Sequence, residues 1–350
     1  MTFEKIFYII FLVSILKGDC MSGNVKTIGI LTSGGDAPGM NAAIRAVART
    51  AIRRGIKVFG INRGYNGLIE GDVFPMEERY VSNIIHSGGT CLYTARSPKF
   101  KTEEGIKQAC ENCKKFGIDG IVVIGGDGSY RGARDLSLSG IPCVGIPGTI
   151  DNDISSTDET VGFDTAMNTA MVMIDRLRDT SQSHDRCSVV EVMGRRCGDI
   201  ALKTAIATGA TAVLVPEIEF DLKRDVYDRI LYGKKCGKNN FIIVVAEGVC
   251  NNNGVGDVFD ISKKIEEATG VETRGTILGH VQRGGSPTLR DRVLASRFGS
   301  YAVDLVSQGI GNRVVCLKDN KIVDYDIYEA LEMKKTIDKK QYEIAYEISI

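Results

Sequence analysis

The sequence predicts an α/β protein of two domains, each with a mostly parallel sheet flanked by helices. Short runs rich in valine and isoleucine alternate with segments of helical period, which is typical of parallel sheets covered on both faces. Glycine-rich turns follow several of these runs, where such sheets bind their ligands. With 350 residues, 40 of them glycine, the chain is long enough for two cores. No low-complexity linker separates them, so we expect two Rossmann-like domains that share a tight cleft.

Strands and helices are expected to alternate through the first half of the chain. The predicted strands comprise residues 26–31, 58–62, 121–124 and 144–146, and the predicted helices comprise residues 40–54 and 102–116. Glu103 and Glu104 lie in the first turn of the second helix, where acids favour the helix dipole. Right-handed crossovers should join these strands into a parallel sheet.

A further helix is predicted over residues 163–177. Its apolar residues recur at spacings of three and four, at Phe163, Ala166, Met167, Ala170, Met171, Ile174 and Leu177. This spacing indicates one buried helical face and not a cofactor site. A second series of strands follows in chain order, over residues 187–192, 212–216, 241–246 and 313–317.

The bulk composition excludes some classes of partner. Lys plus Arg and Asp plus Glu each total 44, so the formal net charge is zero. A neutral chain is a poor candidate for binding nucleic acid or an anionic membrane surface. Ten cysteines lie without paired spacing, which favours free thiols, a reducing compartment and a cytoplasmic protein. The CxxC motif of Cys110 and Cys113 falls within a predicted helix, and Cys143 and Cys316 are predicted core residues.

The first twenty residues differ from the rest of the chain. Residues 6–16 form an apolar run of eleven residues, which is too short to span a bilayer. A signal-peptide core is one interpretation, but Glu4 lies beside Lys5 and no small-residue cleavage site follows. We expect residues 1–20 to be a misassigned or non-native extension, with the true start at Met21.

Two loops with aspartates and glycines are the strongest functional motifs. The first, Gly-Gly-Asp-Gly-Ser at residues 125–129, follows the apolar run 121–124. Glycines there let backbone amides approach phosphate oxygens, and the Asp127 carboxylate suits Mg²⁺. A structural turn needs one glycine and not three in four residues. The loop therefore predicts nucleotide-phosphate binding without identifying the phosphate acceptor.

The second loop, residues 147–153, carries Asp151 and Asp153 two residues apart. In an extended segment, residues i and i+2 point to the same side. One carboxylate could then bind a metal ion while the other accepts a proton from the substrate. The alternative interpretation is a solvated Asx turn without a chemical role.

Weaker signals come from a glycine turn at residues 32–39 and from single polar side chains. The turn follows the first strand and opens a helix, which makes a natural anion site, although such turns are common in α/β folds. Arginine offers bidentate recognition of phosphate. Five arginines lie in polar loops, where each alone would equally be a surface charge, and His280 alone would equally be structural. The arginines are Arg96, Arg186, Arg195, Arg274 and Arg283.

Taken together, these motifs resemble those of bacterial-type ATP-dependent 6-phosphofructokinases, over residues 26–335. The matching segments read LTSGGDAPGMNAAIR at 31–45, IGGDGS at 124–129, PGTIDND at 147–153, VEVMGR at 190–195 and LGHVQRGG at 278–285. The resemblance implies an active site in the inter-domain cleft and transfer of the γ-phosphoryl group of ATP to the 1-hydroxyl of fructose 6-phosphate. The expected division is an ATP-binding domain of residues 21–162 and 282–332, and a fructose 6-phosphate-binding domain of residues 163–281 and 333–350.

The resemblance also implies roles for individual residues. ATP would be bound by Gly35, Arg96, Ser97, Gly126, Asp127, Gly128 and Ser129. Mg²⁺ would be held by Asp127 with help from Asp153. The catalytic residues would be Asp151, Arg195, Thr149 and Gly35. Asp151 would act as the base, and Arg195 would contact the transferred phosphoryl group. Besides Thr149, Asp151 and Arg195, the sugar phosphate would be bound by Met193, Gly194, Glu247, His280 and Arg283, and by Arg186 and Arg274 of a neighbouring subunit. Shared sites of this kind imply a homotetramer.

An effector site for ADP or phosphoenolpyruvate is also part of the family pattern. Its matching residues are Arg45, Arg49, Arg178, Gly209, Lys235 and Lys238. Three positions depart from the pattern, because Glu78 replaces an arginine, Thr211 a glutamate and Cys236 a lysine. Loss of cations weakens an anion site, so the usual regulation is not assumed. Ser97 also replaces an aromatic residue near the nucleotide, which should loosen adenine packing.

The phosphoryl donor is predicted from two glycines. In this family, pyrophosphate-dependent members carry Asp and Lys at the positions of Gly128 and Gly148. Bulk at either position would occupy space that the nucleotide needs, so ATP is favoured. A pyrophosphate-dependent phosphofructokinase and a non-catalytic sugar-phosphate sensor stay as alternatives, although the intact Asp127, Asp151 and Arg195 argue against a sensor. A NAD-type kinase with the same GGDG loop would leave the arginines unexplained.

Overall fold

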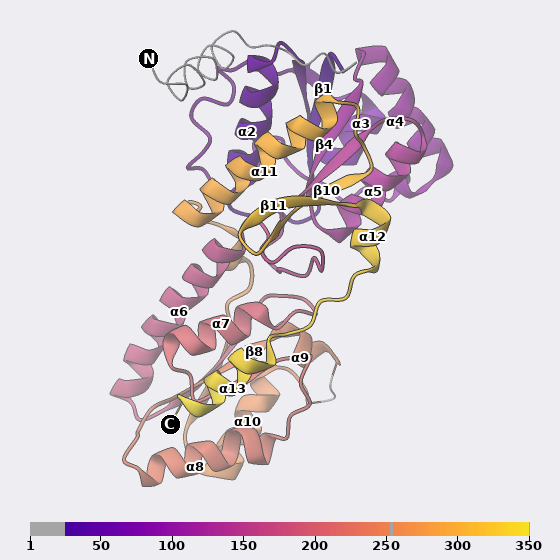
Figure 1. Ribbon diagram of the computed structural model, residues 1–350. Helices are drawn as coiled ribbons and strands as arrows, with labels where there is room; N and C mark the ends of the chain where they lie inside the picture. Colours follow the sequence, from indigo (N-terminus) through magenta and orange to yellow (C-terminus); the bar gives the residue numbers. More distant parts are fainter. Residues whose placement is uncertain (1–24, 253–254, 350) are drawn as a thin grey trace, which may run out of the picture.

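The computed structural model describes residues 25–252 and 255–349, and its described part forms two α/β lobes (Figure 1). The expectations for residues 1–20 and for a start at Met21 lie outside the described residues. The upper lobe in Figure 1 holds the N-terminal half of the chain and the lower lobe holds most of the remainder. This agrees with the predicted α/β architecture of two domains.

The sheet of the upper lobe has the strand order β11-β10-β5-β4-β1-β2-β3. β1, β4 and β5 are parallel to one another and buried along their whole length, as expected of apolar strands covered on both faces. The pairs β2–β3 and β10–β11 are antiparallel. The strands are β1 (Thr27–Ser33), β2 (Lys57–Ile61), β3 (Val73–Pro75), β4 (Gly120–Gly125), β5 (Cys143–Pro147), β10 (Arg313–Lys318) and β11 (Lys321–Asp326).

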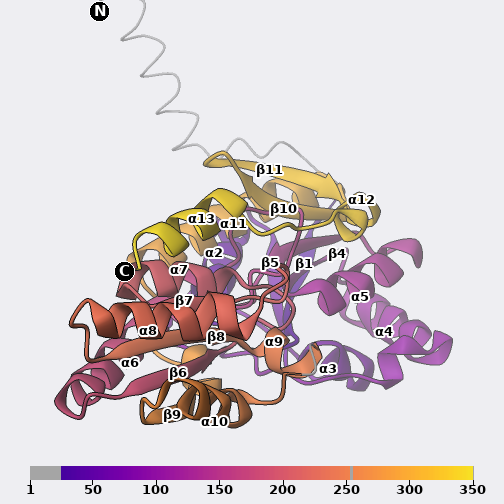
Figure 2. The same cartoon turned by 90° about the horizontal axis from the view of Figure 1, so that it is seen from below.

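Helices cover both faces of this sheet. α2 and α11 lie on one face, and α3, α4 and α5 lie on the other (Figure 2). The helical segments are α2 (Met40–Arg53), α3 (Gly64–Glu70), η1 (Lys99–Lys101), α4 (Glu103–Phe116), α5 (Asp127–Leu138), α11 (Leu289–Ser307) and α12 (Ile327–Glu332). α4 begins where predicted, because Thr102 Oγ1 accepts a hydrogen bond from the Gly105 amide at 3.1 Å. It ends at Gly117, whose φ of 64° is left-handed.

The sheet of the lower lobe is entirely parallel, in the order β7-β8-β6-β9. Its strands are β6 (Cys187–Val192), β7 (Ala212–Leu214), β8 (Phe241–Ala246) and β9 (Thr273–Ile277). The helical segments are α6 (Phe163–Ser183), α7 (Asp199–Thr208), η2 (Lys223–Tyr227), α8 (Asp228–Lys235), α9 (Glu247–Asn252), α10 (Val258–Thr269), η3 (Gly279–Arg283) and α13 (Lys339–Glu347). In α6 the predicted apolar face is in the core, with Phe163, Ala166, Ala170 and Ile174 buried.

One predicted strand belongs to the other sheet. Residues 313–317 were expected to continue the second series of strands, but β10 pairs with β5, with Arg313 opposite Val144. α11 carries the chain back to the upper lobe before β10 begins, so chain order alone misplaces this strand. The expectation for residues 313–317 as part of the second series is therefore wrong, although the division implied by the resemblance had assigned residues 282–332 to the first domain.

The chain passes between the lobes several times. Asp291 of α11 joins the lobes by capping α6: its Oδ1 accepts from the Gly162 amide and its Oδ2 from the Thr165 amide, each at 2.8 Å. Burial raises the pKa of Asp291 to about 6. The last crossing runs from α12 to α13 through residues 333–338 and is the yellow segment between the lobes in Figure 1.

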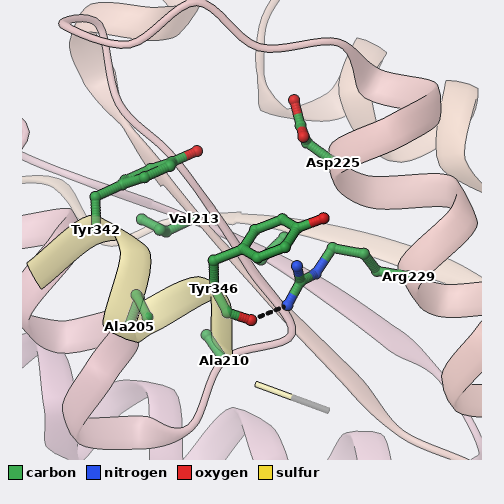
Figure 3. A pocket seen from close by; sticks show the side chains of 9 residues that line it. Ala205, Ala210, Val213, Asp225, Arg229, Tyr342 and Tyr346 are labelled. Atoms are coloured by element: carbon green, nitrogen blue, oxygen red, sulfur yellow. Dashed lines mark hydrogen bonds between the residues drawn. The ribbon is translucent and has the colours of Figure 1, made fainter. Parts of the chain in front are cut away.

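Helix α13 is held to the lower lobe by one buried arginine. Arg229 donates to the Tyr346 carbonyl at 2.8 Å and to the Thr211 carbonyl at 2.9 Å, and its guanidinium lies 3.9 Å from the Tyr346 ring centroid (Figure 3). A cavity of about 10 Å³ lies beside these residues. It has room for no more than a water molecule, so this region is a packing contact and not a ligand pocket.

The nine described cysteines are free thiols. Cys110 and Cys113 are both residues of α4, and Cys143 and Cys316 are fully buried, as predicted. Among residues 25–252 and 255–349, no helix is both long and apolar enough to cross a membrane.

Candidate active site

The carboxyl ends of β1, β4 and β5 meet at one edge of the upper sheet. Ser33 lies opposite Gly125, and Gly125 lies opposite Pro147. The glycine turn at residues 32–39 and the two aspartate loops therefore leave the sheet at the same level. Parallel pairing thus brings together three motifs that are far apart in the sequence.

These loops open into a pocket of about 1190 Å³. The upper lobe supplies the three loops, and the lower lobe adds side chains from beyond β6 and from η3. The predicted site residues that line it are Gly35, Arg96, Ser97, Gly126, Asp127, Gly128, Ser129, Thr149, Asp151, Asp153, Arg195, His280 and Arg283.

Asp151 is the buried carboxylate of this pocket. Its side chain is 4% exposed, and it faces Arg283 Nη2 at 3.8 Å through Oδ1 and Arg195 Nε at 3.7 Å through Oδ2. No hydrogen bond reaches Oδ1. Burial, followed by the charge of Asp153, raises the pKa of Asp151 to about 6, against the opposing effect of the two arginines. A carboxylate that lines a pocket and is only partly neutralised by its neighbours can accept a proton from a ligand.

The loop around Asp151 is not extended, in contrast to the basis of our prediction. Ile150 and Asp151 form a turn in which Thr149 Oγ1 accepts from the Asp151 amide at 3.2 Å, and Asn152 has a left-handed φ of 51°. Asp151 and Asp153 nevertheless line the same pocket, and Arg195 Nη1 lies 3.3 Å from Asp153 Oδ2. The local hydrogen bonds of the turn, and not strand alternation, bring the two carboxylates together.

Asp127 begins helix α5, so the backbone amides of the first helical turn face the pocket. Its Oδ2 accepts from Nε and Nη2 of Arg131, at 3.2 and 3.1 Å. Both side chains are about half exposed, so this pair is weak and can open. The hydroxyl of Ser129 in the same loop donates to the Ser33 carbonyl at 3.0 Å and therefore fastens α5 to β1.

Glycine is suited to positions 35 and 128 of the pocket for two different structural reasons. A Cβ at Gly35 would lie 2.7 Å from Arg283 Nη1, so glycine there makes room for that arginine. A Cβ at Gly128 would meet no protein atom within 4 Å, which agrees with the idea that a side chain there would enter ligand space.

The same argument does not apply to Gly148. A Cβ there would lie 3.0 Å from Ile124 Cγ2 and 3.2 Å from Met40 Cε. Because Gly148 is thus already needed for packing against the core, it carries less information about the phosphoryl donor than we expected from the sequence.

Three predicted sugar-binding residues lie behind the pocket lining. Met193 is buried and its amide donates to Gln282 Oε1 at 3.3 Å. Gly194 has a φ of 139°. Glu247 Oε1 accepts from the Arg195 amide at 2.5 Å. Met193, Gly194 and Glu247 therefore support the backbone that carries Arg195.

Arg186 and Arg274 are at the other end of the lower sheet. Arg186 precedes β6 while Met193 follows it, a separation of about 20 Å for a strand of this length. Both arginines pair with Glu272, Arg186 Nε at 2.9 Å from Oε2 and Arg274 Nη2 with Oε1. Within one chain the structure therefore does not bring them to the pocket.

The predicted effector residues fall into two separate groups. Arg45 and Arg49 lie on α2 in the upper lobe, where burial, followed by the charge of Arg49, lowers the pKa of Arg45. Arg178, Gly209, Lys235 and Lys238 lie in the lower lobe, near α7 and α8. Burial, followed by the charges of Arg178 and Arg229, lowers the pKa of Lys238, and its Nζ donates to Thr211 Oγ1 at 3.2 Å. Glu78 and Cys236 are exposed.

Sequence reasoning missed several residues of the pocket. Tyr65 and Phe100 stack with ring centroids 4.1 Å apart, and Tyr65 donates to the Ser129 carbonyl at 2.5 Å. The missed cations are Lys101, Arg131 and Arg134. Arg131 could have been found, because it lies four residues after Asp127 on a helix. Tyr65 and Phe100 could not, because nothing in the sequence places α3 beside η1.

The carboxylates of the pocket suit a divalent metal. Within residues 25–252 and 255–349, no group of three His, Cys, Asp or Glu side chains converges on one point. Mg²⁺ commonly takes one or two carboxylates together with substrate phosphates. Asp127 and Asp153 each hold an arginine in the pocket, so both carboxylates already stabilise a cation there. The donor set therefore fits a hard metal ion that arrives with a phosphate ligand.

The pocket is thus that of an α/β protein whose cations and carboxylates suit a phosphorylated ligand. A family model described as phosphofructokinase matches residues 27–306. The chain is 57% identical over 326 residues to the ATP-dependent 6-phosphofructokinases of Bacillus thuringiensis (strain Al Hakam) and Bacillus cereus (strain AH187), covering 93% of this chain and 100% of each relative. The chain belongs to the phosphofructokinase family.

Solved structures agree with this assignment. The phosphofructokinase of Saccharomyces cerevisiae is similar with a TM-score of 0.83 and 36% identity, covering 93% of this chain and 48% of that chain. A pyrophosphate-dependent phosphofructokinase from Marinobacter aquaeolei has a TM-score of 0.78 at 20% identity, covering 90% of this chain and 86% of that chain. The second likeness shows the fold alone. The protein is therefore a kinase of this family, and kinases of this family need a divalent metal.

Proposed function

We propose that the protein transfers the γ-phosphoryl group of ATP to the 1-hydroxyl of D-fructose 6-phosphate, giving fructose 1,6-bisphosphate and ADP in glycolysis. The observation that carries this proposal is the 57% identity to relatives named ATP-dependent 6-phosphofructokinase, over 93% of the chain. The pocket supports it, because a buried carboxylate, two further aspartates and several arginines meet at the ends of β1, β4 and β5.

ATP is assigned to the part of the pocket next to α5. The amides at the start of α5, together with Gly35, Gly126 and Gly128, are placed to bind phosphate oxygens. Arg96 and Ser97 line the same pocket. Asp127 and Asp153 would hold Mg²⁺, which supplies charge neutralisation for the phosphoryl group when bound. Phosphoryl transfer depends mainly on positioning and on charge neutralisation.

Asp151 is assigned as the base. Above its pKa of about 6 it is ionised, so the carboxylate can take the proton of the 1-hydroxyl as the oxygen bonds to the γ-phosphorus and ADP leaves. General-base catalysis typically contributes about 10²- to 10⁴-fold. Arg195 and Arg283 hold the carboxylate between them. Arg195, 62% exposed, is free to turn toward the transferred phosphoryl group.

Fructose 6-phosphate is assigned to the side of the pocket formed by Thr149, His280 and Arg283, supported by Met193, Gly194 and Glu247. Its 6-phosphate would be bound by Arg186 and Arg274 of a neighbouring subunit. Their distance from the pocket within one chain supports this assignment. The same proposal includes a homotetramer with shared sites and a cytoplasmic location. It also includes the domain division, with boundaries at residues 162, 281 and 332.

ADP or phosphoenolpyruvate remains the proposed effector, between subunits. Buried guanidinium nitrogens of Arg45 and Arg49 have no hydrogen-bond partner, which supports an anion site on α2. Glu78 and Cys236 each replace a cation of the family pattern, and Thr211 replaces a glutamate, so weak effector binding is expected. An activity titration with each effector tests this.

A coupled assay with purified protein, fructose 6-phosphate and Mg²⁺ tests the central proposal. Turnover with ATP and none with pyrophosphate is expected. Turnover with pyrophosphate alone would establish the alternative donor. Binding of fructose 6-phosphate without turnover by either donor would establish a sugar-phosphate sensor.

A further inference from the structure

The peptide between Asp151 and Asp153 is held from behind the pocket. Asn152 is 1% exposed and left-handed, with a φ of 51°. Its Oδ1 accepts from the Thr160 amide at 3.1 Å, and its Nδ2 donates to Asp199 Oδ2 at 2.8 Å. Asp199 is the first residue of α7, so a side chain of the lower lobe binds the loop of the upper lobe.

A lysine of the last inter-lobe crossing completes this contact. Lys335 lies in residues 333–338, and its Nζ donates to the Asn152 carbonyl and lies 3.3 Å from Asp199 Oδ2. The side chains of Lys335 and Asp199 are only 20% and 13% exposed. Three segments thus meet at Asn152: the loop after β5, the start of α7 and the crossing between α12 and α13.

The buried charges of Asp199 and Lys335 stabilise each other. A carboxylate as buried as that of Asp199 is costly unless a cation is close. A second acid is near, because Glu217 Oε1 accepts from the Gly198 amide at 2.8 Å. Burial raises the pKa of Glu217, the charge of Asp199 adds to this, and the charge of Lys335 opposes it. Lys335 therefore both neutralises Asp199 and binds the catalytic loop.

We propose that Lys335 is a positioning residue for phosphoryl transfer. By holding the Asn152 carbonyl and Asp199, it fixes the peptide that directs the Asp151 and Asp153 carboxylates into the pocket. Loss of Lys335 removes the cation that holds the Asn152 carbonyl, which lets this peptide rotate and moves both carboxylates. This inference rests on the proposed function.

The test compares Lys335→Met with Lys335→Arg and with Lys334→Met. Lys334 is adjacent but exposed, so its variant is a matched control with unchanged kinetics. For Lys335→Met we expect kcat to fall by about 10- to 100-fold, as a small misplacement of reacting groups can cause, with the KM values for ATP and fructose 6-phosphate within about threefold. Lys335→Arg keeps a cation and a donor and should recover part of kcat.

A second comparison separates positioning from folding stability. The double variant Lys335→Met with Asp199→Asn removes both charges, so its Tm should recover relative to Lys335→Met. Its kcat should stay low, because the Asn152 carbonyl still lacks the lysine and keeps only the weaker hydrogen bond from Cys197 Sγ at 3.7 Å. Recovery of kcat together with Tm, or wild-type kcat in Lys335→Met, would overturn the proposal. Lack of turnover in the wild-type protein would instead refute the proposed function.

Discussion

At the scale of single residues, the burial of Asp151 costs folding stability and also raises its pKa toward a value that suits a base. Asp151 is buried next to Asp153, and the two arginines at 3.7 and 3.8 Å compensate only part of that cost. Its pKa therefore lies at about 6, between its usual value of 3.8 and neutrality. A base with this pKa is ionised at pH 7 and yet binds a proton more readily than an exposed aspartate.

The pH dependence of kcat/KM should show this shift. We expect an acid limb with a midpoint near pH 6, where Asp151 gains its proton, and a tenfold loss of kcat/KM per pH unit below it. The phosphate of the substrate also titrates at about pH 6, so affinity for fructose 6-phosphate is measured calorimetrically over the same range. A midpoint near pH 4, after correction for this affinity, would contradict the assignment of Asp151.

The stability of the ligand-free protein should depend on the same carboxylate. The folded pKa of Asp151, about 6, is above the unfolded value of 3.8, so its stability contribution is present below pH 3.8 and is lost as pH rises through 6. Asp151→Asn should therefore raise the free energy of unfolding at pH 8 by about 2–3 kcal/mol, at 1.4 kcal/mol per pKa unit.

Thermal unfolding of wild type and Asp151→Asn at pH 4 and pH 8 is the measurement. The gain in Tm should be present at pH 8 and nearly absent at pH 4. A variant that is less stable than wild type at pH 8 would show that the arginine contacts outweigh the burial of the charge.

At the scale of elements, the last helix depends on one arginine. Arg229 is 5% exposed and donates to the carbonyls of Thr211 and Tyr346. Arg229→Met leaves both carbonyls without this donor and should lower the free energy of unfolding by about 1–3 kcal/mol. Amide exchange over residues 339–347 should become faster than elsewhere in the lower lobe, because α13 loses its main polar anchor.

Arg224→Met is the matched control for Arg229. Arg224 pairs with Asp225 beside the same helix but its side chain is 64% exposed, so exchange in α13 should stay as in wild type. Equal exchange in both variants would mean that the apolar contacts of α13 suffice to hold it.

At the scale of the whole molecule, a single chain does not bring all of the assigned substrate-binding residues to its own pocket. The pocket gathers Asp127, Asp151, Arg195 and Arg283, while Arg186 and Arg274 pair with Glu272 at the far end of β6. If subunits share sites, hybrids of Asp151→Ser and Arg186→Ala subunits should regain activity that both parents lack, because some sites then receive an intact residue from each.

Co-expression of the two variants tests this sharing, with hybrid oligomers confirmed by native mass spectrometry. The control combines Asp151→Ser with Asp127→Ala, two residues of one pocket, and should stay inactive. Hybrids that form but remain inactive would place Arg186 in the site of its own chain.

Much of the framework could be predicted from local patterns. β6 and β8 have the predicted bounds, and α4 begins with the acids and N-cap that the sequence contains. Short or weakly patterned elements such as α3, β3 and β11 gave no clear signal. The loops could be recognised because several glycines and aspartates follow apolar strands, and the roles of single side chains came from the resemblance to phosphofructokinases. Tyr65, Phe100 and Lys335 required tertiary contacts.

The amino-acid sequence by itself determined the class of fold, the three loops at the strand ends and the chemistry that their side chains can perform. Those properties depend on neighbours in the chain, on strand burial and on intrinsic acidity. Only the tertiary structure decided that Asp291 caps α6 and that Lys335 binds the peptide beside Asp151. Contacts between residues more than a hundred positions apart depend on how the two lobes pack, and no local pattern encodes them.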